Sequence, residues 1–146
     1  MKNIGKHLLE IRSYEGAGYQ ALIDYDQWQV AMLRYCDDLL PERILTMQRH
    51  NETDEVFVLL EGRCILFLGE GKDTVASITA VDMQPRKLYN VKRRVWHCHT
   101  LDRGTSVLIV ENRNTTVQNS PKIFLNDDQR RKIADITREL WFEENQ

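Results

Sequence analysis

The sequence lacks any apolar run that approaches the roughly 20 residues a helix needs to cross a bilayer. Its first residues, 1–7, are polar and do not form the apolar stretch of a secretory signal. Both features lead us to expect a cytoplasmic protein that has no membrane partner.

Net charge is also small, because 22 acidic residues nearly balance 20 basic ones and leave a formal charge of −2. With a pI of about 6.1, the chain has no overall field that would attract nucleic acid. The local basic run at residues 92–94 is short and lies in a segment rich in strand formers. We therefore expect no nucleic-acid partner.

Cysteine is scarce and scattered. Cys36, Cys64 and Cys98 are the three present, and no two of them have CxxC spacing. An odd number at scattered positions argues against a disulfide scaffold and against a cysteine-based zinc ribbon. We expect all three to be small buried side chains of a protein in a reducing compartment.

What the sequence does contain is a series of short runs rich in strand-forming residues, separated by turn residues. Gly62, between two such runs, predicts a tight hairpin. Many evenly spaced strands are typical of an all-β sandwich or barrel, in which closure leaves few free strand edges. The runs cover residues 28–35, 44–50, 55–60, 63–68, 77–81, 87–91, 95–100 and 106–111.

The two ends of the chain differ from this middle. The N-terminal part shows no sustained period, which indicates an extension. Near the C-terminus, Asn126 offers an N-cap side chain, and the two aspartates after it complement the dipole of a helix. Apolar residues then recur at helical spacing. We predict one domain over residues 1–146, with an extension at 1–27, a barrel at 28–115 and a helix at 126–142.

Three of the four histidines lie in the strand-rich middle. His50 and Glu55 flank a polar corner of four residues, so a hairpin-like turn could bring their side chains together. His97 and His99 are two apart and share one face of a strand, as do Gln48 and His50. If both faces line a barrel interior, these side chains converge on one cavity. The alternative is that both strand histidines are satisfied core residues and Glu55 a surface residue.

Imidazole and carboxylate groups that converge in this way suit a divalent metal such as zinc, iron, nickel, manganese or cobalt. A rigid barrel interior could also leave coordination positions open for a ligand. The spacing alone does not choose between these metals.

The stretch 50–62 resembles the first conserved motif of the cupin superfamily, in which a histidine, a glutamate and a glycine recur at the spacing of His50, Glu55 and Gly62. The stretch 89–97, which ends in His97, is similar to the second motif. The resemblance covers about residues 28–115. It implies a double-stranded β-helix, or jelly-roll, barrel in which a metal is held by His50, Glu55 and His97.

Two departures from the family pattern bear on the site. Gln48 stands where the first histidine of the motif is usual, and an amide oxygen is a weaker ligand for a transition metal. His99 could compensate, because it shares a strand face with His97. Lys92 and Arg94 replace the proline and glycine that usually precede the second-motif histidine, which leaves the form of that turn open.

These features predict a metal-dependent enzyme that acts on a small polar or anionic metabolite. Isomerase, lyase and dioxygenase chemistry all remain open, because a fold does not fix a reaction. Glu55 would balance the charge of the metal or act as a catalytic base. The alternative is a non-catalytic cupin that binds or senses a small molecule or metal, which the weaker ligand Gln48 favours. In either case, or if the barrel is purely structural, we expect a homodimer.

Overall fold

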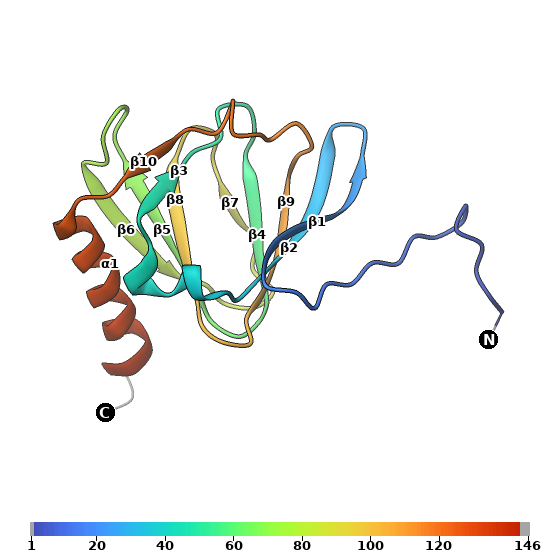
Figure 1. The fold of residues 1–146 in the computed structure, drawn as a ribbon, viewed down its shortest axis with the longest axis horizontal. Coiled ribbons are helices and arrows are strands. Elements are labelled where there is room, and N and C mark those ends of the chain that lie inside the picture. The colour runs from blue at the N-terminus through green and yellow to red at the C-terminus, as the bar shows by residue number, and fades with distance from the viewer. Residues whose placement is uncertain (1, 144–146) are drawn as a thin grey trace.

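The computed structural model describes residues 2–143 as two five-stranded antiparallel sheets that face each other (Figure 1). Sheet A has the strand order β1-β2-β9-β4-β7, and sheet B has the order β10-β3-β8-β5-β6. The strands are β1 (Gly18–Tyr25), β2 (Trp28–Arg34), β3 (Thr46–Gln48), β4 (Glu55–Glu61), β5 (Cys64–Glu70), β6 (Ser77–Asp82), β7 (Tyr89–Val91), β8 (Trp96–Leu101), β9 (Ser106–Asn112) and β10 (Lys122–Phe124). The helical segments are 3-10 turns at Asp37–Leu39 and Pro41–Arg43, α1 (Asp127–Arg138) and a π-helical turn at Glu139–Glu143.

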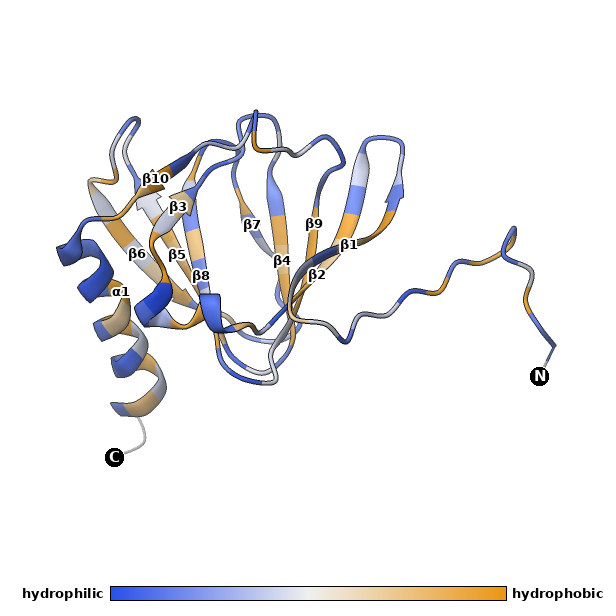
Figure 2. Cartoon of the chain, viewed as in Figure 1, coloured by the Kyte–Doolittle hydropathy of each residue, from blue (hydrophilic) through white to orange (hydrophobic). Residues whose placement is uncertain are grey.

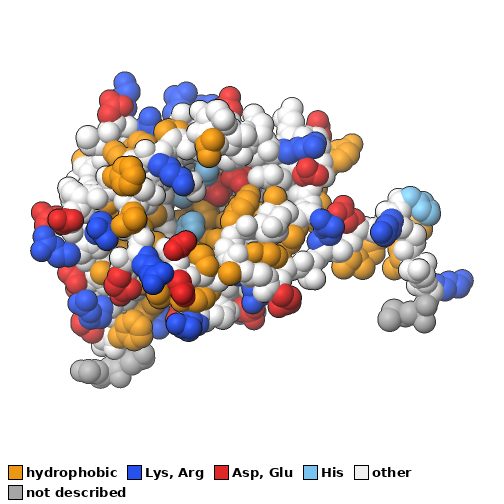
Figure 3. All heavy atoms as spheres, in the orientation of Figure 1, with side chains coloured by type: hydrophobic (Ala, Val, Ile, Leu, Met, Phe, Trp, Pro, Cys, Tyr) orange, Lys and Arg blue, Asp and Glu red, His pale blue; other side chains and the backbone are white. Residues whose placement is uncertain are grey.

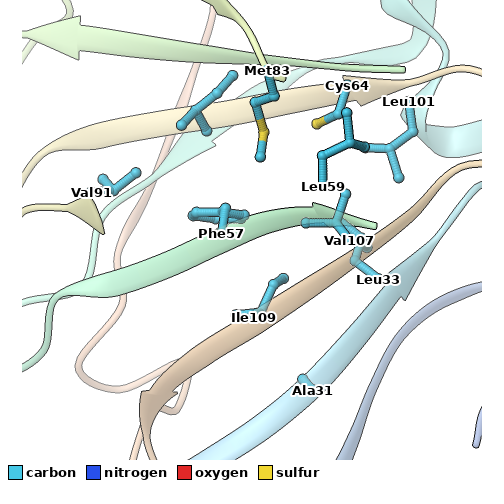
Figure 4. Packing of buried hydrophobic residues seen from close by; sticks show 11 residues of the cluster. Ala31, Leu33, Phe57, Leu59, Cys64, Met83, Val91, Leu101, Val107 and Ile109 are labelled. Atoms are coloured by element: carbon cyan, nitrogen blue, oxygen red, sulfur yellow. The ribbon is translucent and has the colours of Figure 1, made fainter. Parts of the chain in front are cut away.

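The space between the sheets is filled by side chains that alternate along each strand. In β4, Phe57 and Leu59 are 0% and 2% exposed, whereas their neighbours along the strand are more accessible. Val107 and Ile109 of β9 meet them from the adjacent strand (Figure 4). Figure 2 shows hydrophobic residues within the strands and mostly hydrophilic loops at their ends. The alternation follows from the period of two in a strand, and it fixes which residues of each strand face the interior.

A second apolar cluster lies on the outer face of sheet B, where α1 packs. Ile133 and Trp141, which are 0% and 4% exposed, belong to this cluster together with Phe67 and Cys98 of the sheet. The helix begins as the sequence predicts, because the Asn126 side chain accepts a hydrogen bond from the backbone N–H of Gln129 at 2.8 Å. The predicted C-terminal helix is therefore confirmed. It packs on the outside of the barrel and does not occupy the interior.

The predicted N-terminal extension through residue 27 is not confirmed, because β1 lies inside it and pairs with β2 in sheet A. The residues before β1 lead away from the barrel toward the N-terminus (Figure 1), although the carbonyl of Tyr14 still accepts a hydrogen bond from Arg34 of β2. They carry exposed apolar side chains, among them Leu8 at 73% and Ile11 at 79%. The short apolar alternation of β1 is weak in the sequence, and its place in the sheet depends on pairing with β2.

Two tight turns set the positions of the strands around the site. Gly62 has φ +83°, and a Cβ atom there would lie 2.6 Å from the Cα atom of Thr105, so only glycine fits. Arg94 adopts φ +70° without being glycine, and its N–H donates to the carbonyl of His50 at 2.8 Å. The turn before His97 thus forms despite the replaced glycine.

No helix within residues 2–143 is long and apolar enough to cross a membrane.

Candidate metal centre

His50, Glu55 and His97 lie together in the barrel interior and are called the buried triad below. His50 follows β3, Glu55 begins β4, and His97 is the second residue of β8. Their side chains are buried, with exposed fractions of 6%, 4% and 1%. One ligand atom from each of the three lies within 4.8 Å of the others. The sequence therefore identified three residues that the fold brings to one point.

The geometry of the triad centres on one oxygen atom. Oε2 of Glu55 lies 2.9 Å from Nε2 of His50 and 2.8 Å from Nε2 of His97. The outer nitrogen of each ring has its own partner. Nδ1 of His97 is 3.0 Å from the carbonyl oxygen of Val95. A carbonyl only accepts, so this Nδ1 carries a hydrogen.

The hydrogen-bond partners of His50 place a hydrogen on its Nδ1 as well. Nδ1 of His50 is 2.7 Å from the hydroxyl of Ser120, and that hydroxyl donates to Oδ1 of Asn119 at 3.1 Å. Oδ1 of Asn119 also accepts from the N–H of Thr116, which fixes the orientation of the amide. The Ser120 oxygen is thus left to accept from Nδ1–H of His50, and both rings direct Nε2 at Glu55.

Two neutral rings protonated at Nδ1 would present two lone pairs to a carboxylate oxygen. Three acceptors at hydrogen-bond distance require a positive charge among them, supplied by a proton or by a metal cation. Hydrogen bonds from the outer ring nitrogen are also the usual support of histidines that bind metals. The donor set of the triad therefore fits a divalent metal ion.

Glu55 and His50 also shift each other's pKa. Burial alone would raise the pKa of Glu55, but its hydrogen bonds with His50 and His97 and their charges lower that pKa well below its usual range. Burial alone would lower the pKa of His50, whereas the contacts with Glu55 and Glu111 raise it above its ordinary value. Without a metal, the contact between Glu55 and His50 therefore favours the charged form of each side chain.

Gln48 and His99 line the pocket beside the triad but do not belong to the three-residue group. Gln48 ends β3 directly opposite His97 in β8. Burial and the charge of His97 lower the pKa of His99 to about 4, so this ring is neutral at neutral pH. The metal-ligand roles of both residues stay predictions.

The sequence reasoning missed Glu111 and the two residues that hold it. Oε1 of Glu111 accepts hydrogen bonds from the hydroxyl of Tyr19 at 2.6 Å and from Nε2 of Gln29 at 3.1 Å. Its Oε2 lies 3.8 Å from Nε2 of His50. Burial and the nearby charge of Glu55 raise the pKa of Glu111. Burial and the bond to Glu111 likewise raise the pKa of Tyr19.

His50 and Glu55 of the triad, but not His97, line a pocket of about 630 Å³. One part of its wall is polar and includes Glu111 and Ser120, whereas Leu33 and Ile109 form an apolar part. The exposed residue Lys122 lines this pocket and a neighbouring one of about 500 Å³. Figure 3 shows histidine and acidic side chains within a hollow on this face of the molecule. The site is therefore open to a small organic ligand.

Trp96 and Cys98, which alternate with the histidines in β8, do not line the 630 Å³ pocket. Trp96 and Cys98 belong to the outer cluster beneath α1. Burial raises the pKa of Cys98 to about 12, so a thiolate ligand at this position is unfavourable.

Comparison with known proteins identifies the fold. No family model matches the chain, and no curated protein is similar to it in sequence. The nucleoside dehydratase Pac13 of Streptomyces, solved as a variant with uridine, superposes with a TM-score of 0.54. It is 11% identical, and the match covers 80% of this chain and 87% of Pac13.

A cupin-2 domain protein from Shewanella frigidimarina is 15% identical, with a TM-score of 0.49 and coverage of 70% of this chain and 85% of that protein. Identities this low show a shared fold and not a shared activity. The paired antiparallel sheets, the C-terminal helix α1 and the superposition on Pac13 agree with the fold that the sequence motifs imply. The chain has the jelly-roll β-barrel fold of the cupin superfamily.

Proposed function

We propose that the protein is a metal-dependent enzyme that acts on a small polar or anionic metabolite. The observation that carries the proposal is the convergence of Nε2 of His50, Nε2 of His97 and Oε2 of Glu55 on one buried point. Three acceptors in that arrangement need a proton or a metal cation between them, which a divalent ion would supply, and the pocket beside them offers space for a ligand.

The residues of the triad would hold the ion, while Ser120 and the Val95 carbonyl orient the two imidazole rings. A bound divalent metal would supply Lewis-acid or redox chemistry at the floor of the pocket. Gln48 and His99 are the candidates for further coordination positions, as the sequence predicts. Glu55 would balance the charge of the ion or act as a base.

The charges around the pocket favour a small anionic ligand. Lys122 lines the pocket, and a divalent ion would add positive charge at its floor. Pac13, which shares the fold, has been solved with uridine, so a barrel of this kind can receive an organic molecule. Isomerase, lyase and dioxygenase reactions all remain compatible with the triad.

The alternative function is that of a non-catalytic cupin that binds or senses a metal or a small molecule. Gln48 favours it, because an amide in place of a histidine weakens the hold on a transition metal. Conversion of a bound metabolite by the metal-loaded protein would exclude this alternative. Binding of a metabolite that is released unchanged would favour it.

We also propose a homodimer. The N-terminal residues lead away from the barrel and expose Leu8 and Ile11 to solvent, which favours burial of these two side chains against a second copy. Analytical ultracentrifugation of the wild type and of Leu8→Asp tests this. We expect a dimer for the wild type and a weaker one for the variant, and a monomeric wild type would contradict the proposal.

Elemental analysis of protein purified without an affinity tag tests the metal function. We expect close to one equivalent of a transition metal in the wild type and none in His97→Ala. His7→Ala is the matched control, because His7 is exposed in the N-terminal arm. A wild type without bound metal that also fails to take up added Zn²⁺ or Co²⁺ would contradict the proposed function.

A further inference from the structure

Two buried polar atoms of the pocket-lining side chains have no hydrogen-bond partner within residues 2–143. They are Oε2 of Glu111 and Nδ1 of His99. Glu111 lies in β9, and only 7% of the residue is exposed, so water has little access to its side chain. An unpaired carboxylate oxygen at such a depth is costly, and a bound molecule that supplies a donor removes that cost.

The other oxygen of Glu111 is held firmly in place. Oε1 accepts from Tyr19 and Gln29, and Nε2 of Gln29 also lies 3.1 Å from the Tyr19 hydroxyl. These contacts fix the rotation of the carboxyl group. Oε2 is then left at 3.8 Å from Nε2 of His50, which is too long for a hydrogen bond. It is a preorganised acceptor beside the triad.

The remaining walls limit what kind of molecule would supply the donor. Leu33 and Ile109 make part of the wall apolar, and Lys122 offers a positive charge. We infer that the pocket binds a hydroxy acid with an apolar substituent, its hydroxyl donating to Oε2 of Glu111 and its carboxylate facing Lys122. This inference rests on the proposed function, because it names the ligand class of the same pocket.

Mandelate and its methyl ether, methoxyphenylacetate, provide the probes. Both have a carboxylate and an apolar ring, but only mandelate has a hydroxyl that can donate. Isothermal titration calorimetry of the wild type in the presence of Zn²⁺ would compare their dissociation constants. A hydrogen bond to a charged acceptor predicts that mandelate binds at least about tenfold more tightly.

Glu111→Gln would replace the acceptor Oε2 of Glu111 with a hydrogen-bond donor. Tyr19 and Gln29 would keep the amide oxygen at the position of Oε1, so the amide nitrogen would replace Oε2. We expect the preference for mandelate to disappear or reverse in this variant. Glu61→Gln is the control, because Glu61 is exposed at the other end of β4, about 20 Å along the strand from Glu55.

The outcomes separate this inference from the proposed function. Equal binding of the two acids by the wild type, binding of neither acid, or a preference that survives in a folded Glu111→Gln, would each overturn the inference while Zn²⁺ still binds. Failure to bind Zn²⁺ with an intact preference for mandelate would overturn the proposed function alone. Thermal unfolding of each variant shows whether the fold is retained.

Discussion

Gln48 lies directly opposite His97 in the antiparallel pairing of β3 with β8. Side chains directly opposite each other in such a pair lie on the same face, with Cβ atoms about 5 Å apart. The residue at position 48 therefore lies beside a triad histidine, at the position where the cupin motif usually has its first histidine.

Gln48→His should tighten metal binding. An imidazole at this position would add a stronger nitrogen ligand next to His97, and we expect the affinity for Zn²⁺ to rise by about tenfold or more. Competition with a chelator of known affinity measures the change. An unchanged affinity in a folded variant would place residue 48 outside the coordination sphere.

Ser120→Ala should weaken metal binding without removing a ligand. The substitution deletes the acceptor of Nδ1–H of His50, which holds the ring in its orientation and protonation state. Loss of such a support typically costs about 10–100-fold in affinity. Ser77→Ala, at an exposed serine of β6, is the control and should bind as the wild type does. Equal affinities for both variants would show that Ser120 does not orient the ligand.

His99 should make the metal-free protein less stable at acidic pH. Its pKa is about 4 in the folded protein and 6.5 for an unperturbed side chain. Between these values the unfolded chain binds more protons than the folded one, so stability is lost as the pH falls from about 6.5 to about 4. The shift corresponds to a loss of about 3 kcal/mol.

Urea unfolding of the wild type and of His99→Leu, with a chelator present, measures this effect. Leucine removes the titration and leaves no unpaired polar atom. We expect the free energy of unfolding of the wild type to fall more steeply across this window than that of the variant. His7→Ala should follow the wild type. Parallel curves for the wild type and His99→Leu would contradict the assignment.

Much of the fold and of the triad was predictable because the signals are local. The spacing of His50, Glu55 and Gly62 carries the first motif, and the turn at Gly62 needs positive φ. The N-cap at Asn126 likewise depends on neighbouring residues. Each of these features is fixed within a few residues of the chain, and the structure contains all of them.

Glu111 and its partners were not predicted because their contacts are distant in sequence. Tyr19 lies in a segment read as an extension, and only the pairing of β1, β2 and β9 brings it to Glu111. One signal was present, since Glu111 continues the inward alternation of Val107 and Ile109. Ser120 had no such signal, because it precedes the short strand β10.

Anomalous diffraction from crystals soaked in Co²⁺ or Zn²⁺ tests the metal centre most directly. We expect one peak in the barrel at about 2.1 Å from Nε2 of His50, Nε2 of His97 and an oxygen of Glu55. The peak should be absent in His97→Ala soaked in the same way. A wild-type barrel without a peak, or with its only peak away from these three residues, would contradict the account.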